Sequence, residues 1–337
     1  MTDPRLATST DFGRMYAREV GGELLVPSIT TVIGQQASDL SGWHGYMAAK
    51  AVLEDSRASR PMHSNGMKFA IIRDAASASE RYRDQAAARG DRVHNYAENI
   101  ALRAMGKDHE LERTREELLQ HGEQAYADRL DEWWDAWRPR PLAAEVTVWN
   151  ETVGYAGTLD LVAEIAGRVC IIDYKTKGTD KRGRVKPLDN KVVMQLVAGV
   201  KAEEALVDAE AGQWQPWQYG SAPILMGVAV GETQVLPQQA NPNVLKENWR
   251  KFCALRRVWE INRLLDEETG DHLMPVVPPP AHLLATPPAV DPAQAIEPVS
   301  VQEVEGAPSL EELALDASSE TATAPSSIEE PTAERGN

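Results

Sequence analysis

The chain has 337 residues, of which 42% are hydrophobic, so it is long enough to bury a substantial core in one large domain or two ordinary ones. Its start, MTDPRLATSTDFGRMYAREV, shows no basic segment leading into an apolar run, and its longest strongly apolar stretch, Ile224 to Val230, is too short to span a bilayer, so a soluble, unexported protein is expected. A formal net charge of −16 excludes an evenly basic surface, and any nucleic-acid-binding surface must therefore be local.

Residues 1–80 are expected to form an N-terminal subregion that packs on the rest of the chain. Leu24 to Ile33 is rich in β-branched residues. Ser41 to Leu53 follows, and its apolar residues suit one face of a helix.

Two long helices are predicted next. The first runs from about Ala75 to Met105, and its second half carries His94 and Glu98 one turn apart. The second runs from about Leu111 to Trp137 and ends at an Arg-Pro pair. Its tryptophans are interpreted as core residues.

The character then changes to short β-rich runs separated by turns. Three successive antiparallel strands are predicted, at residues 143–150, 154–165 and 168–176. Beyond a polar, basic loop we expect a helix from Asn190 to Ala209, strands at residues 224–230 and 232–238, and a closing helix from Asn243 to Leu265. This order predicts an α/β fold with a mixed β-sheet flanked by helices.

The end of the chain is acidic. From Pro275 to Asn337 there are eleven acidic residues and one basic residue, and subtracting this −10 from the total of −16 leaves −6 on residues 1–274. The segment is rich in Pro, Ala, Ser, Thr and Glu, which is typical of disorder. We expect a disordered tail at residues 275–337, either purely solubilising or with a transient helix at Leu310 to Leu315 for a partner.

Two acidic residues and a lysine carry the strongest chemical signal. Asp160 lies near the middle of one predicted strand and Asp173 near the end of the next, with Lys175 two residues later and therefore on the same face as Asp173. Buried charges of this kind need compensation. A divalent cation would supply it, because Mg²⁺ and Mn²⁺ prefer oxygen ligands, and it would activate a water against phosphate.

Three motifs point to a known family. GTLD, at Gly157–Asp160, followed by IIDYKTK, at Ile171–Lys177, resembles the metal-binding hairpin of the RecB-like branch of the PD-(D/E)XK nucleases. GDRVH, at Gly90–His94, resembles the first motif of that branch. VPSITTVIG, with Trp43 further along, resembles the opening of RecB-like exonucleases carried by bacteriophages and related to the CRISPR-associated exonucleases. The similarity spans roughly residues 25–265 and implies a restriction-endonuclease-like fold with its nuclease core at residues 81–270.

The resemblance also implies roles for single residues. One or two Mg²⁺ or Mn²⁺ ions would be bound by His94, Asp160, Asp173 and the carbonyl of Tyr174. Lys175 would assist the attacking water, and Gln195 would lie near that lysine and the phosphate.

Some positions depart from the family pattern or stay open. The CRISPR-associated relatives usually hold an iron–sulfur cluster with four cysteines, whereas this chain has only Cys170 and Cys253, so no iron–sulfur cluster is expected and both thiols are interpreted as reduced core residues. Some relatives carry a tyrosine where this chain has Gly199. Glu145 is either an additional metal ligand or a strand-edge carboxylate beside solvent.

The loop after the second aspartate is basic. Its cations are expected to contact nucleic-acid phosphates, although such loops are often only solvated. They are Lys177, Lys181, Arg182, Arg184 and Lys186.

The sequence therefore predicts a metal-dependent deoxyribonuclease. An exonuclease in recombination, repair or phage DNA metabolism is favoured, in the cytoplasm of a bacterium or of a phage-infected host. Its partner would be DNA, together with a recombinase, a single-strand-binding protein or a helicase, and no membrane.

Two alternatives remain open. A catalytically silent nucleic-acid-binding module of a recombination complex would bind without metal or turnover. An enzyme acting on another phosphate ester or a carboxylated small molecule would be inhibited by a small substrate but not by DNA.

Overall fold

The computed structural model describes residues 5–58, 64–269 and 272–280. The chain divides into two compact units, Met1–His272 and Leu273–Asn337. Of the second unit only residues 273–280 are described, and these contain neither helix nor strand. The remainder of the predicted acidic tail, including Leu310 to Leu315, lies outside the described residues.

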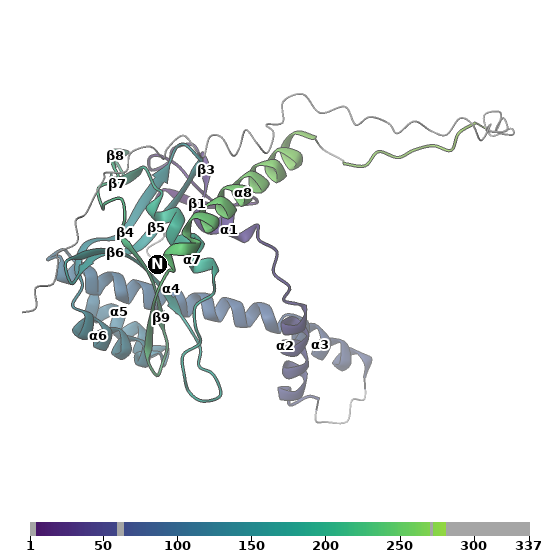
Figure 1. Cartoon of the computed structure of the whole chain (residues 1–337). Helices are drawn as coiled ribbons and strands as arrows, with labels where there is room; N and C mark the ends of the chain where they lie inside the picture. Colours follow the sequence, from purple (N-terminus) through teal and green to yellow (C-terminus); the bar gives the residue numbers. More distant parts are fainter. Residues whose placement is uncertain (1–4, 59–63, 270–271, 281–337) are drawn as a thin grey trace, which may run out of the picture. The chain divides into compact units, whose positions relative to one another are not determined.

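A small antiparallel sheet stands at the start of the described chain (Figure 1). It consists of β1 (Ala7–Thr10), β2 (Gly13–Tyr16) and β3 (Val26–Pro27). The β-branched run from Leu24 to Ile33 is divided between β3 and helix α1 (Ile29–Gly34). The helix begins there because Ser28 Oγ accepts the N–H of Thr31 at 2.9 Å and caps its first turn.

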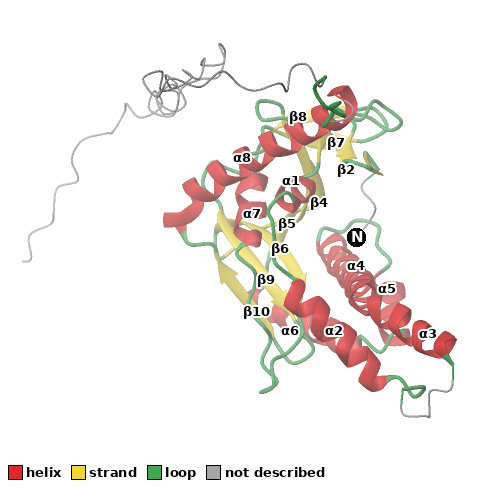
Figure 2. Cartoon of the chain, turned by 90° about the vertical axis from the view of Figure 1, so that its right-hand side faces the viewer, coloured by secondary structure: helices red, strands yellow, loops and turns green. Residues whose placement is uncertain are grey.

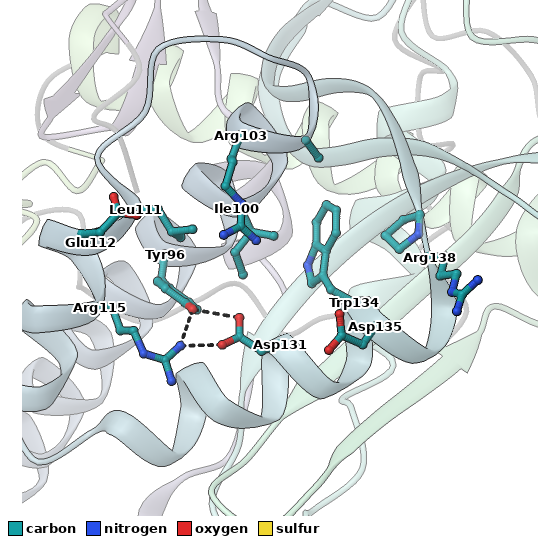
Figure 3. A pocket seen from close by; sticks show the side chains of 12 residues that line it. Tyr96, Ile100, Arg103, Leu111, Glu112, Arg115, Asp131, Trp134, Asp135 and Arg138 are labelled. Atoms are coloured by element: carbon teal, nitrogen blue, oxygen red, sulfur yellow. Dashed lines mark hydrogen bonds and ion pairs between the residues drawn. The ribbon is translucent and has the colours of Figure 1, made fainter.

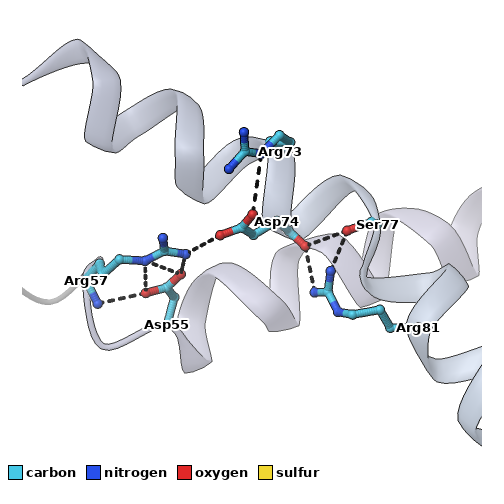
Figure 4. A network of polar contacts seen from close by, with 6 residues as sticks. All are labelled: Asp55, Arg57, Arg73, Asp74, Ser77 and Arg81. Atoms are coloured by element: carbon cyan, nitrogen blue, oxygen red, sulfur yellow. Dashed lines mark hydrogen bonds and ion pairs between the residues drawn. The ribbon is translucent and has the colours of Figure 1, made fainter.

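Three helices follow: α2 (Ser41–Glu54), α3 (Asn65–Ala76) and α4 (Ala78–Ala104). The predicted helix from Ala75 to Met105 is interrupted at Ser77, which separates α3 from α4. Arg57 lies 2.6 Å from both Asp55 and Asp74 and so ties the end of α2 to α3 (Figure 4).

The predicted helix from Leu111 to Trp137 is in fact two helices, α5 (Leu111–Gln120) and α6 (Gln124–Trp137). The chain turns between them at Gly122, whose φ of 70° is left-handed and suits a glycine. The apolar residues on both sides of this turn continue the same helical spacing, which is why the sequence predicts one continuous helix.

A seven-stranded sheet, counted over the described residues, forms the centre of the first unit. Its order is β10-β9-β6-β5-β4-β7-β8. The strands are β4 (Arg140–Asn150), β5 (Tyr155–Ile165), β6 (Arg168–Thr176), β7 (Glu204–Asp208), β8 (Gln213–Pro216), β9 (Ile224–Val230) and β10 (Val235–Gln239). The pairs β4–β5 and β5–β6 are antiparallel, as predicted, whereas β6 and β9 are parallel, so the sheet is mixed.

Helix α7 (Lys191–Val200) connects β6 to the far edge of the sheet. The predicted helix from Asn190 to Ala209 is too long, because the chain leaves the helix after Val200 and residues 204–208 form β7. The apolar residues in this stretch fit the period of a helix as well as that of a strand. Pairing with β4 and β8 stabilises the strand. The closing helix α8 (Leu245–Leu264) confirms the last predicted element.

Helices cover the two faces of the sheet, so the predicted α/β class is confirmed (Figure 2). Helices α4, α5 and α6 share one apolar cluster with β5, β6 and β9. Helices α7 and α8 share another with β4, β5 and β6. None of the helices in the described residues combines the length and the apolar character that a membrane crossing requires.

Candidate metal and phosphate site

The candidate site lies where two neighbouring strands part. The last paired residues of the β5–β6 ladder at this end are Leu161 and Ile172, and the next residues along each strand are Asp160 and Asp173. Beyond this point the N–H of Tyr174 donates to Asp160 Oδ2 at 2.7 Å, so a side chain takes the place of a ladder carbonyl. Where the strands part, side chains from the layer of α4, α5 and α6 and from the layer of α7 and α8 line the same cavity.

The regular alternation of side chains between the two faces of the sheet is also broken in β5 at Asp160. In a regular strand, residues two apart face the same side. Leu161 packs in the cluster of α4, α5 and α6, whereas Leu159 packs in the cluster of α7 and α8. Glu145 lies opposite Asp160 in the β4–β5 register and has a φ of 47°, which is uncommon and costly for a residue with a side chain. The irregular backbone brings the two carboxylates together.

Asp173 and Lys175 share a face of β6, as their spacing predicts. Lys175 Nζ donates to Asp173 Oδ1 at 2.7 Å. Burial raises the pKa of Asp173 to about 6, although the ammonium of Lys175 acts in the opposite direction. Burial alone would lower the pKa of Lys175, but the charges of Asp173 and Asp160 outweigh it and hold this pKa above its usual value. Lys175 is therefore a stable ammonium, suited to donate hydrogen bonds rather than to accept a proton.

His94, Glu145 and Asp160 form a group with metal-ligand geometry: one ligand atom from each lies within 4.8 Å of the others. Burial, together with the charges of Asp160 and Glu98, raises the pKa of Glu145 well above its usual range. Burial opposes ionisation of Asp160 as well, but His94 and Lys175 lower its pKa. Sequence reasoning left Glu145 open between a ligand and a solvent-facing carboxylate, and the structure places it in this group.

Two buried atoms at the site have no hydrogen-bond partner among the described residues. These are His94 Nδ1, which lies 3.4 Å from Asp160 Oδ2, and Asp173 Oδ2. Orphaned polar atoms of this kind are rare in proteins and call for an explanation such as an ion. An imidazole nitrogen and carboxylate oxygens fit Mn²⁺, and carboxylate oxygens with water fit Mg²⁺.

A cavity of 130 Å³ adjoins the group. Lys175 and Gln195 line it together with the three candidate ligands, so α7 brings the predicted glutamine to the same space as the lysine. The remaining polar lining comes from residues that sequence reasoning did not select: Arg14, Tyr16, Ser28, Thr30 and Thr158. Four of these belong to the N-terminal segment, and the motif VPSITTVIG was the one signal that could have pointed to two of them.

Two glycines permit the close packing around this cavity. A Cβ at position 157 would meet Ile29 Cδ1 at 2.5 Å, so Gly157 lets α1 approach β5. A Cβ at position 199 would meet Leu159 Cδ2 at 2.6 Å. Gly199 thus lets α7 pack directly against β5 at this position.

The side chain of Tyr174 points away from Asp173 and Lys175. It lies in the cluster of α4, α5 and α6, with its ring edge-on to His94 at 6.4 Å between centroids. Its predicted contribution is its backbone carbonyl. In the structure its backbone N–H donates to Asp160, and Tyr174 pairs with Val228 in the β6–β9 ladder.

The five cations of the predicted phosphate-contacting loop do not line the cavity. Lys181, Arg182, Arg184 and Lys186 are exposed, and Lys177 is half-buried. Arg184 pairs with Asp180 at 2.8 Å, which holds the loop in a turn. The structure therefore does not bring these cations into the cavity beside Asp160.

A larger cavity of 530 Å³ lies among α4, α5 and α6 (Figure 3). Tyr96 donates to Asp131 at 2.8 Å, and Arg115 donates to Tyr96 at 2.7 Å and also pairs with Asp131. Three arginines and three carboxylates line this cavity, so it has no excess charge. Tyr96, Arg115 and Asp131 bond to one another, and the described residues that form a group with metal-ligand geometry lie elsewhere.

Comparison with known proteins adds little. No protein-family model matches the chain, and no curated protein matches it. Among solved structures, the one described as "Crystal structure of SSO0001" is similar over 55% of this chain and 85% of that chain, with 13% sequence identity and a TM-score of 0.22. A likeness this distant carries no argument about function.

Proposed function

We propose that the protein is a divalent-metal-dependent nuclease that hydrolyses phosphodiester bonds of DNA, with an exonuclease as the favoured form. The observation that carries the proposal is the convergence of Asp160, Asp173 and Lys175 at the end of the β5–β6 ladder. The resemblance of GTLD and IIDYKTK to the hairpin of RecB-like nucleases supports it.

The charge of the site favours a cation. Glu145 and Asp160 belong to the group with metal-ligand geometry, and Asp173, which lies outside that group, feels the charge of Asp160. The cationic partners near these carboxyls are Lys175 and His94, which is charged only when protonated. A bound cation would add positive charge and so offset the free-energy cost of burying the three carboxyls of Glu145, Asp160 and Asp173. We assign His94, Glu145, Asp160 and Asp173 as residues that would hold the ion, with the carbonyl of Tyr174. A bound Mg²⁺ or Mn²⁺ would lower the pKa of a water and offset negative charge on a phosphate oxygen.

The chain's own residues supply the rest of the chemistry. Lys175, a permanent ammonium beside Asp173, would orient the attacking water and stabilise charge that gathers on the phosphate. Gln195 lines the same cavity and would donate its amide to a phosphate oxygen. Arg14 and the hydroxyl groups of Ser28, Thr30 and Thr158 add donors that suit phosphate.

The test is cleavage of end-labelled linear DNA with Mn²⁺ or Mg²⁺. Asp173→Ala and Lys175→Ala are expected to abolish cleavage, because they remove a ligand and the ammonium. Asp108→Ala is the matched control, since Asp108-His109-Glu110 also places a charged residue two positions after an aspartate, but on the exposed loop after α4. Undiminished cutting by both site variants would reject the proposal. Products released one nucleotide at a time from an end would identify an exonuclease.

A further inference from the structure

A third cavity, of 560 Å³, lies at the opposite end of β6 from Lys175. It shares no lining residue with the cavity beside Asp160. Arg168, the first residue of β6, lines it, and seven residues at about 3.3 Å each place it about 23 Å along the strand from Lys175. A molecule bound there would leave the candidate metal site open.

The floor of this cavity is apolar. Val197 and Leu225 are buried beneath it, while Ile224, Leu245 and Trp249 are half-buried and line it. These side chains come from α7, β9 and α8, so the elements that make the floor are fixed by their packing in the core. The floor can take up the apolar side chains of a ligand without rearrangement.

The rim of the cavity is cationic. Arg168, Lys201 and Lys246 line it and are all exposed, and no Asp or Glu is among the lining residues, all of which lie in the described chain. None of the three forms an ion pair with a described residue, although Lys201 Nζ lies 6.0 Å from the centre of the Trp249 ring. In a chain with a net charge of −16, a rim of cations without carboxylates is a local exception.

We propose that this cavity is a docking site for an acidic segment of a partner protein, one that carries leucine or phenylalanine among its carboxylates. The apolar floor would receive the leucine or phenylalanine, and the three cations would meet the carboxylates, which gives charge complementarity as well as burial. Nucleic acid fits less well, because its phosphates need a row of cations along a groove and its bases an exposed ring to stack on, whereas Trp249 is packed against Phe252 at 5.8 Å.

The experiment measures binding of a fluorescein-labelled acidic peptide, built from Asp, Glu, Leu and Phe, to the full chain by fluorescence anisotropy. One comparison peptide carries Asn and Gln for the acids, and another carries Ser for Leu and Phe. The variant is Lys201→Glu with Lys246→Glu, which reverses the rim charge at two exposed positions. Lys251→Glu is the matched control, because Lys251 is exposed on α8 but does not line the cavity.

We expect saturable binding of the acidic peptide, weakened about tenfold or more by the double reversal and unchanged by Lys251→Glu. Both comparison peptides should bind at least about tenfold more weakly. Thermal unfolding of each variant checks that it is folded, and this readout does not depend on nuclease activity.

Equal affinity in the double variant and the parent protein would overturn the proposal. So would equal binding of the amide peptide, since the rim would then contribute nothing. Tighter binding of a single-stranded oligonucleotide, or of vesicles with an anionic headgroup, than of the peptide would assign the rim to phosphate instead.

Discussion

Two segments of this chain have the same Asp-x-Lys spacing and different surroundings. In Asp173-Tyr174-Lys175 the aspartate is 4% exposed and Lys175 Nζ donates to it at 2.7 Å. In Asp189-Asn190-Lys191 the aspartate is exposed, its Oδ1 accepts the backbone N–H of Lys191 at 2.7 Å, and Lys191 Nζ donates to Ser38 at 2.9 Å. The second pair only shapes the approach to α7. Burial at the end of a ladder, rather than spacing, distinguishes the first.

The largest expected effect tests this difference directly. Asp173→Asn should lower the rate of DNA cleavage about 1,000-fold or more, because loss of a group that acts in the transition state has effects of this size. Asp189→Asn should leave the rate within about twofold, since it lies in a solvated loop. Initial rates with Mn²⁺ in excess measure both, and equal losses would show that the two segments do not differ as proposed.

The next largest effect concerns metal affinity, which should distinguish a buried carboxyl at the site from an exposed one elsewhere. Glu145→Gln is expected to weaken Mn²⁺ binding by about 10-fold to 100-fold, at least the loss seen when groups that only orient a ligand are removed. Isothermal titration calorimetry of metal-free protein measures it, with Glu116→Gln as the exposed control on α5. Unchanged affinity in Glu145→Gln would remove Glu145 from the proposed ligand set.

The basic loop is expected to act on DNA affinity but not on catalysis. Lys181→Ala with Arg182→Ala should lower affinity about tenfold and reduce the slope of log affinity against log salt by roughly one to two, since each lost phosphate contact changes this slope by about 0.9. Anisotropy across a salt series measures the slope. An unchanged slope would mean that the loop is solvated and does not contact DNA.

The smallest effect concerns packing beside the site. Gly199→Ala should lower the free energy of unfolding by about 1 kcal/mol, because the new Cβ meets Leu159 Cδ2 at 2.6 Å and the overlap exceeds the gain in helix propensity. Gly45→Ala should raise it by about the same amount, since nothing lies within 4 Å of that position on α2. Urea unfolding of the two variants should show opposite signs.

The sequence predicted the central strands well because their signals are local. Residues 169–172 form a short apolar run typical of a buried strand, and a turn at residues 166–167 precedes it. The break at Gly122 was missed because a single turn residue does not decide whether a helix ends. The change from α7 to β7 was missed because its apolar residues fit both a helix and a strand, and only pairing with β4 and β8 decides between them. The short strands β1, β2 and β8 carry too few apolar residues to be noticed.

The candidate site divides in the same way. Asp173 and Lys175 could be selected because their spacing within one strand fixes a common face, and Asp160 because GTLD precedes that strand. Glu145 could not be decided, because its approach to Asp160 depends on a φ of 47° that no pattern reports. Arg14 enters the cavity only through the packing of β2 beside β5, a contact between segments far apart in the sequence.

The parting of β5 from β6 at Leu161 and Ile172 has a wider consequence. Since the gap opens toward both layers, the imidazole arrives on α4 and the amide of Gln195 on α7, two helices with no common apolar cluster. The imidazole and the amide are therefore positioned by two separately packed layers that meet at the candidate site.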